Sequence, residues 1–295
     1  MINIEYKNHI QGLRSFSVLI VFFYHLNFEY FAKGYLGVDI FFVISGFVIT
    51  QRLYKDFLIH KKILLLDFYV RRVKRIIPNL FFIVITTYVF YLFFGPPNIT
   101  LWKDALSSLA GVSNLYFLYS DQGYFYNIQN NPLVHTWSLG VEEQFYLFFP
   151  FLVFLVFKFA NDRIGYLAIV LFPILIASIS AAMYLQNTFP NYTFYYPLLR
   201  FWEFCVGSIF FLFSDKFNQN KKIGTLAILI ICLVIFIDTS LPYLANNTII
   251  VLLTGIFLTN YKNGILANNK YILKMGLISY SFYLWHLPII YFLDL

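Results

Sequence analysis

An arginine and a histidine lie inside the first apolar stretch of the chain, GLRSFSVLIVFFYHLNF, as Arg14 and His25. Eleven helical steps of about 100° return both side chains to nearly the same face, roughly 16 Å apart along the axis. This places a fixed cation near one membrane surface and a titratable imidazole deeper in. Ionisable groups in a lipid-spanning helix are costly and usually have a function. An interfacial anchor and a histidine bonded to a neighbouring helix would also explain them.

The composition indicates an integral membrane protein. Of the 295 residues, 60% are hydrophobic and 12% are charged, with a mean hydropathy of +0.71. An ordinary soluble domain does not have this balance. We expect an all-α, polytopic transmembrane helical bundle in which one domain covers residues 1–295, with about nine spans read from apolar runs. The runs lie near 13–31, 36–51, 78–95, 142–159, 165–186, 197–214, 223–238, 246–260 and 276–295.

Basic residues gather in alternate loops, which predicts the orientation of the bundle. The positive-inside rule places the N-terminus and the basic loops in the cytoplasm. The first run follows a polar leader with no small-residue cleavage site, so we expect it to be retained. The same distribution explains the formal net charge of +7 without a nucleic-acid partner. Cys205 and Cys232 lie in apolar runs without metal-site spacing, so we expect no metal.

A basic segment, IHKKILLLDFYVRRVKRIIP, separates the second and third apolar runs and ends at Pro78. Its mixture of apolar and cationic residues predicts an amphipathic segment on the inner membrane surface. Arg72 and Arg75 are three residues apart, and Arg71 and Arg75 are four apart, so a helix would bring them to one side. They could clamp a polyanion, or they could contact anionic lipid headgroups.

A second polar segment, NNPLVHTWSLGVEEQFYLFFP, places His135, Ser138, Glu142 and Glu143 around the expected start of a helix. Carboxylates in a first turn favour the helix dipole, and Ser138 is a candidate N-cap. A cap requires neither a nearby histidine nor a second carboxylate. The segment therefore predicts either a capped helix start or a functional polar site on the outer side.

A third polar pair lies in YPLLRFWEFCVGSIF, where Arg200 and Glu203 are three residues apart and can pair on one helix face. Gly207 follows seven residues after Arg200 and allows another helix to approach closely. Such a pair inside a membrane bundle is more often structural than catalytic.

The last apolar run, SYSFYLWHLPII, contains Ser279, Tyr283 and His286 at positions i, i+4 and i+7. This spacing predicts one polar stripe on a helix. A packing role for His286 is slightly favoured over a functional one.

Five motifs together resemble the acyltransferase 3 family of membrane O-acyltransferases. In chain order they are GLRSFSVLIVFFYH, GYLGVDIFFVISGFVIT, FYVRRVKRIIP, HTWSLGVEEQFYL and SYSFYLWHLP. The resemblance implies a multi-pass enzyme of the bacterial inner membrane that moves an acyl group, usually acetyl, from cytoplasmic acyl-CoA to a hydroxyl of an exported glycan. The fourth motif is most similar to the branch that acylates lipopolysaccharide O-antigen or related surface sugars.

The family's motif positions are carried by particular residues here. Its arginine-to-histidine motif falls on Arg14 and His25, and its inner-surface basic motif falls on Arg72 and Arg75. Its external-loop motif falls on His135, Ser138 and Glu142.

Transfer from a thioester to an alcohol needs a base, donors for the oxyanion and a clamp for the anionic end of CoA. We expect His25, with Glu142 and His135, to be catalytic, and Arg14, Arg72 and Arg75 to hold phosphates. Asp39, Glu142 or Glu143 could tune His25. Direct transfer and a covalent relay through Ser138, Ser279 or a histidine both stay open. We expect the lipid bilayer, acyl-CoA and a glycan as partners, while the sequence indicates no oligomeric state.

Two other interpretations stay open. A transporter or flippase would also carry intramembrane Arg, Glu and His, although the chain shows no pair of related halves. The second alternative is a truncated, inactive acyltransferase. The chain ends at YFLDL, so we expect the last helix typical of the family to be missing, and with it the exported hydrolase-like domain that close relatives often carry.

Overall fold

The computed structural model describes residues 8–95, 101–120, 131–159, 164–217, 220–237 and 241–293, and all regular structure in these ranges is helical. Nine long helices follow the nine apolar runs, which confirms the expected all-α class. They are α1 (Asn8–His25), α2 (Gly37–His60), α3 (Leu65–Phe94), α7 (Thr136–Phe159), α8 (Gly165–Leu185), α10 (Pro197–Leu212), α11 (Lys221–Phe236), α12 (Tyr243–Asn260) and α14 (Lys270–Leu293).

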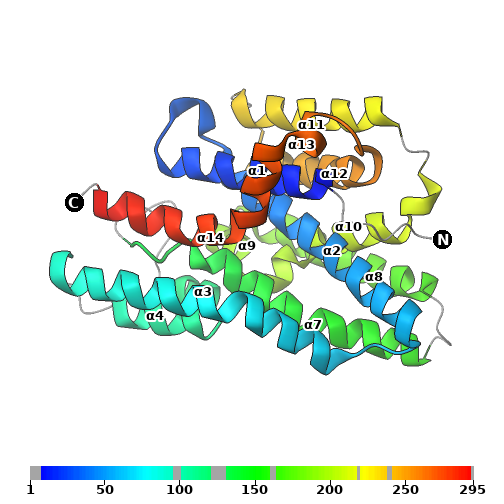
Figure 1. The fold of residues 1–295 in the computed structure, drawn as a ribbon, viewed down its shortest axis with the longest axis horizontal. Coiled ribbons are helices and arrows are strands. Elements are labelled where there is room, and N and C mark those ends of the chain that lie inside the picture. The colour runs from blue at the N-terminus through cyan, green and yellow to red at the C-terminus, as the bar shows by residue number, and fades with distance from the viewer. Residues whose placement is uncertain are drawn as a thin grey trace.

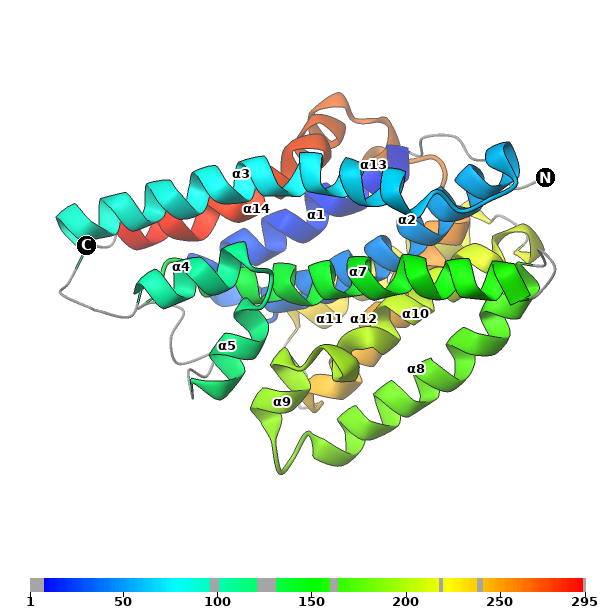
Figure 2. The same cartoon turned by 90° about the horizontal axis from the view of Figure 1, so that it is seen from below.

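Within the described ranges, four short α-helices connect the long ones. They are α4 (Leu101–Leu109), α5 (Ser113–Tyr119), α9 (Pro190–Tyr195) and α13 (Ile265–Asn268). Figure 2 shows α4 and α5 at the end of the bundle where α14 finishes, and the start of α1 toward the opposite end.

The centre of the bundle is formed by α10, which packs against α2, α8 and α12. The first helix, α1, packs against α14 and α2, and α11 covers α12 at one edge (Figure 1). The helices α1 and α14 run parallel: the backbone oxygen of Gln11 lies against Gly276 near both starts, and His25 meets His286 near both ends. The polar residues of the first and the last helix, α1 and α14, are therefore neighbours.

Six of the described helices are long and apolar enough to cross a membrane, namely α2, α3, α7, α8, α12 and α14. The other three expected spans, α1, α10 and α11, form helices of 18, 16 and 16 residues. The polytopic membrane character is thus confirmed, and the total of about nine spans stays a prediction.

Two predicted element boundaries are wrong. The helix α3 runs without interruption from Leu65 through Pro78 to Phe94, so the basic segment is the first part of a long helix and does not form a separate surface element. The helix α7 begins at Thr136, so Ser138 lies inside the first turn and is not an N-cap, and Glu142 and Glu143 lie beyond the first turn. In both cases tertiary packing extends the helix past the residue that local sequence rules favour as its boundary.

Two glycines set the distance between α2 and α10. A Cβ atom on Gly46 would lie 2.0 Å from the Phe204 carbonyl oxygen, and one on Gly207 would lie 2.0 Å from the Val43 carbonyl oxygen. Because both contacts involve backbone atoms, no side-chain rotation can relieve them. The close approach predicted for Gly207 is confirmed, and it brings the two backbones together as small residues do in membrane bundles.

We expect Gly207→Ala to lower the free energy of unfolding by about 1–3 kcal/mol, because the added methyl group overpacks the α2–α10 contact. Thermal unfolding of the purified protein in detergent measures the effect. Gly165→Ala is the matched control, since a Cβ atom at Gly165 meets nothing within 4 Å. Equal stability of the two variants would contradict the assigned role of Gly207.

Candidate active site

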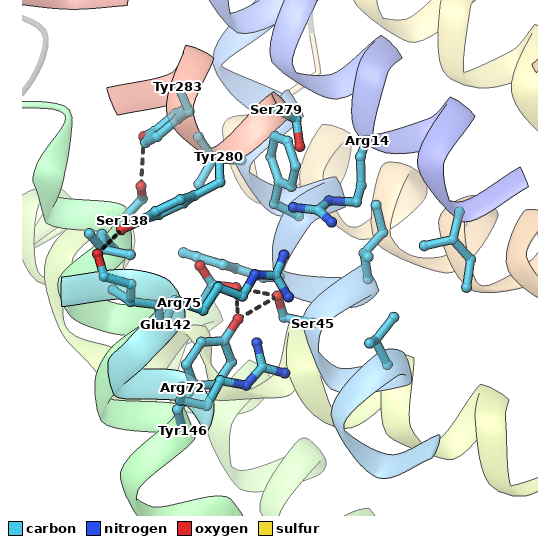
Figure 3. Close-up of a pocket in the computed structure, with 18 of the residues that line it drawn as sticks. Arg14, Ser45, Arg72, Arg75, Ser138, Glu142, Tyr146, Ser279, Tyr280 and Tyr283 are labelled. Carbon is cyan, nitrogen blue, oxygen red and sulfur yellow. Dashed lines mark hydrogen bonds between the residues drawn. The ribbon is translucent and has the colours of Figure 1, made fainter. Parts of the chain in front are cut away.

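A cavity of about 210 Å³ lies among α1, α2, α3, α7 and α14 (Figure 3). Its charged lining consists of three arginines and one glutamate, a formal excess of two positive charges (3 − 1). Such a lining favours an anionic ligand. The polar residues that line it are Gln11, Arg14, Ser45, Arg72, Arg75, Ser138, Glu142, Tyr146, Ser279, Tyr280 and Tyr283.

Three arginines, Arg14, Arg72 and Arg75, form what we call the arginine end of the cavity. Arg14 comes from α1, and Arg72 and Arg75 come from adjacent turns of α3 (Figure 3). The Arg72 guanidinium lies 4.6 Å from the centroid of the Tyr146 ring, a cation–π contact that holds it beside the cavity. Arg71 instead forms an ion pair with Asp56 at 2.6 Å. The structure thus brings the three predicted phosphate-binding residues together.

A carboxylate occupies the middle of the cavity. Glu142 Oε1 accepts hydrogen bonds from Ser45 on α2 and from Tyr146, one turn further along α7 (Figure 3). Ser138 lies one turn before Glu142 on the same helix, so Ser138, Glu142 and Tyr146 follow each other on one face. These three residues form a polar row along α7 that ends beside Arg72.

Three histidines meet beyond the other end of that row, and we call this the histidine end. His286 Nε2 lies 3.1 Å from His25 Nδ1, and the His135 and His286 ring centroids are 5.3 Å apart. The Tyr283 hydroxyl donates to the His135 carbonyl at 2.9 Å and lies 2.6 Å from Ser138 Oγ. Tyr283 and Ser138 therefore connect the cavity to the histidines, which come from three separate parts of the chain.

The ring of His25 has a defined orientation at the last residue of α1. His25 Nδ1 lies 2.8 Å from the Val21 carbonyl oxygen, so Nδ1 carries the hydrogen and Nε2 is the basic nitrogen of the neutral ring. His25 is not one of the described residues that line the cavity. Arg14 and His25, which the sequence places roughly 16 Å apart along one helix, thus have different positions. Arg14 lines the cavity, and His25 lies beside its far end.

Two of the three carboxylates expected near His25, Asp39 and Glu142, have other partners. Asp39 forms a buried ion pair with Arg200, and Glu142 accepts from Ser45 and Tyr146. The Glu143 carboxylate lies against Gly111, where a Cβ atom would come within 2.2 Å of Oε2 and where φ is +67°. Whether one of the three carboxylates tunes His25 stays a prediction.

A second polar cluster is buried between α2, α10 and α12. Arg200 pairs with Asp39 and, at 3.3 Å, with Glu203, which confirms the predicted pairing of Arg200 and Glu203. Asn247 Nδ2 donates to Glu203 Oε1 at 3.2 Å, and Tyr243 accepts from Arg200. Four of these residues are at most 2% exposed, namely Arg200, Asp39, Glu203 and Asn247. The cluster is separate from the cavity and ties three helices together.

The short helix α4 supports the segment that carries His135. Asp104 on α4 accepts from Asn131 at 3.2 Å, and Ser108 Oγ lies 2.7 Å from Thr136 Oγ1 at the start of α7. Burial raises the pKa of the Asp104 carboxyl from its ordinary 3.8 to about 6. The segment that carries His135 is thus held by a carboxyl group that is costly to ionise in place.

Sequence reasoning missed Ser45, Tyr146 and Tyr280 in the cavity. Tyr146 could have been found, because it follows Ser138 and Glu142 at eight and four residues and so shares their helix face. Ser45 and Tyr280 depend on how α2 and α14 rotate about their axes, and a single sequence does not determine that rotation.

Residues 8–294 match the family model described as an acyltransferase domain. O-acetyltransferase OatA of Staphylococcus aureus is 32% identical over 98% of this chain and 51% of its own length. Peptidoglycan O-acetyltransferase OatA of Listeria monocytogenes is 30% identical over 97% of this chain and 50% of its own. Putative peptidoglycan O-acetyltransferase YrhL of Bacillus subtilis is 30% identical over 97% of this chain and 49% of its own length.

The chain therefore spans about half the length of the curated relatives it matches. No solved structure gives a significant match. Two of these relatives are named for peptidoglycan, and the expected O-antigen acceptor finds no support in their names.

We expect Arg200→Met to lower the free energy of unfolding by about 3–5 kcal/mol, because it leaves Asp39 and Glu203 buried without their cation. The triple variant Arg200→Met, Asp39→Asn and Glu203→Gln should recover part of that loss. Denaturation of the detergent-solubilised protein provides the comparison. Wild-type stability of Arg200→Met would show that the cluster does not hold the helices together.

We expect Asp104→Asn to gain stability over the wild type as the pH rises. Because the pKa of this carboxyl is raised in the folded protein, its contribution to stability is fully present at pH values below its ordinary pKa of 3.8. That contribution is lost as the pH rises through about 6. The thermal unfolding midpoints of both proteins at pH 5 and pH 7.5 test this. A difference that stays constant between the two pH values would contradict the burial argument.

Proposed function

Because this chain belongs to the acyltransferase 3 family, we propose that it is a membrane O-acyltransferase that moves an acyl group from acyl-CoA to a glycan hydroxyl. The donor would bind at the arginine end of the cavity, and the acceptor would enter at the histidine end. The acyl group proposed is acetyl, as in the names of the relatives.

One observation carries this proposal: a single cavity contains both a cluster of cations and the polar row that leads to three histidines. Arg14, Arg72 and Arg75 supply fixed donors suited to phosphate groups. The cavity volume of about 210 Å³ is small beside typical drug-sized ligand sites of roughly 300–1,000 Å³. The cavity therefore suits the acyl-thioester end of CoA, with the phosphates at the arginine end and the rest of the nucleotide outside the cavity.

In this proposal the histidine end handles the proton of the acceptor hydroxyl. His25 is the general base, and its Nδ1–H contact with Val21 sets the orientation of the ring. His286 and His135 pack beside it and provide a polar environment for an imidazolium that forms during transfer. Tyr283 and Ser138 lie between these rings and the thioester position.

The acceptor proposed first is peptidoglycan, because relatives from Listeria monocytogenes and Bacillus subtilis carry that acceptor in their names. The positive-inside pattern supports a cytoplasmic N-terminus in the bacterial cytoplasmic membrane, with the arginine end toward the cytoplasm. Acyl-CoA would then reach the arginines from the side on which it is made.

The test is transfer of radiolabel from acetyl-CoA to purified peptidoglycan or lipopolysaccharide in membranes that contain the protein. We expect His25→Ala to reduce transfer by about 10²–10⁴-fold, the usual effect of removing a general base. His60→Ala is the control, since His60 is exposed at the end of α2. Near-normal transfer by His25→Ala would remove His25 as the base.

The donor assignment is tested by the double variant Arg72→Ala and Arg75→Ala. Loss of two charge-assisted contacts should raise the KM for acetyl-CoA by roughly 10–100-fold with a smaller change in kcat. Movement of an unacylated glycan across membranes that lack acyl-CoA would favour the transporter interpretation instead.

A further inference from the structure

Ser45 occupies a distinctive place in the cavity. It lies on α2, is 9% exposed, and donates to Glu142 Oε1 while its Oγ is 3.1 Å from the Tyr146 hydroxyl. Glu142 follows Ser138 by one turn of α7, and Tyr146, on which Arg72 packs, follows by another. Ser45 therefore lies beside Glu142 and Tyr146, the two members of the polar row nearest the arginine end (Figure 3).

A serine hydroxyl beside a carboxylate has the geometry of an activated nucleophile. Serine is a weak nucleophile alone and becomes effective when an adjacent base removes its proton and a third group orients that base. Here Glu142 is the adjacent carboxylate, and the Tyr146 hydroxyl donates to the same oxygen. The nearby Arg72 guanidinium supplies positive charge where an oxyanion would form.

The other two serines among the described lining residues have different partners. Ser138 Oγ lies beside the Tyr283 hydroxyl and the His135 carbonyl, and Ser279 donates to the Gly276 carbonyl of its own helix. Ser45 is the cavity serine whose hydroxyl donates to a carboxylate. This contact distinguishes it as a nucleophile from Ser138 and Ser279.

We propose that Ser45 Oγ carries the acyl group as an ester between the two substrates, an inference that rests on the proposed function. In the first step the Ser45 proton moves to Glu142, Oγ attacks the thioester carbon, the C–S bond breaks, and the leaving CoA thiolate takes that proton. In the second step the glycan hydroxyl attacks the ester carbon and the bond to Ser45 Oγ breaks. The hydroxyl proton then passes to the histidine base, while Ser45 Oγ is reprotonated from that base through solvent or Glu142, so that both steps balance.

The position of Ser45 gives the relay a physical reason. Direct transfer needs the thioester and the acceptor hydroxyl in near-attack contact at the same time. The row from Ser138 to Tyr146 covers eight residues, about 12 Å of helix. An ester on Ser45 would let the donor leave the arginine end before the acceptor advances from the histidine end.

The experiment incubates membranes containing the wild-type chain with labelled acetyl-CoA and no glycan, followed by acid quench, digestion and mass spectrometry. We expect acetylation at Ser45 that disappears when the acceptor is added. Ser45→Ala should form no acyl-protein and should transfer at least 100-fold less label to the glycan. Glu142→Gln should slow acylation by about 10²–10⁴-fold.

Two further variants control the result. Ser45→Cys should form a thioester that neutral hydroxylamine cleaves, which preserves a chemical readout even if Ser45→Ala does not fold. Ser17→Ala is the matched control, because Ser17 is also a buried helical serine, bonded to Leu13, and does not line the cavity. It should acylate normally.

The outcomes separate the relay from the proposed function. The Ser45 relay is overturned if the wild type labels the glycan but carries acetyl at another residue or at none. Near-normal transfer by Ser45→Ala overturns it as well. Both results leave the acyltransferase proposal standing. Absence of both glycan label and protein label from folded wild type overturns both.

Discussion

The contact between α2 and α10 is the constraint on which the site depends. Gly46 and Gly207 let the two backbones touch, and the buried Arg200–Asp39 pair fixes one face of α2 against α10. A guanidinium in such surroundings has to keep its carboxylate, because an unpaired buried charge is very costly. Ser45 follows Asp39 by six positions on α2, a rotation that falls roughly 120° short of two whole turns. Holding Asp39 against α10 therefore turns Ser45 toward the cavity.

The helix α2 thus contributes residues to two separate polar regions, the cavity and the buried cluster around Arg200. Phe42 lies between them: it lines the cavity, and the Arg200 guanidinium lies 5.4 Å from its ring centroid. Trp137, at the start of α7, contacts the same guanidinium at 5.7 Å. Arg200 consequently packs behind two aromatic rings that position α2 and the start of α7. The ion cluster supports the cavity without opening into it.

The sequence predicted the class of fold and many of the polar neighbours, because both depend on local patterns. Apolar runs located every long helix, and three-residue spacing found the Arg200–Glu203 pair. Local rules failed at Pro78 and Ser138, where packing continues the helix past a residue that often marks a boundary. They also could not assign partners across helices. Asp39 pairs with Arg200, 161 positions away, and this choice depends on how two helices rotate against each other.

The separation of Arg14 from His25 has a consequence for the chemistry. Both residues lie on α1, yet Arg14 lines the cavity and His25 lies beyond it, beside His286. The proposed reaction has two substrates of different charge that approach from different sides, so a cation and a base with separate positions suit it better than a single compact site. Parallel packing of α1 and α14 keeps both positions in register, because Gly276 touches Gln11 near one end and His286 touches His25 near the other. The spacing along α1 therefore sets the distance between the cation proposed to hold the donor and the histidine proposed as the base, and the polar row of α7 leads from one to the other.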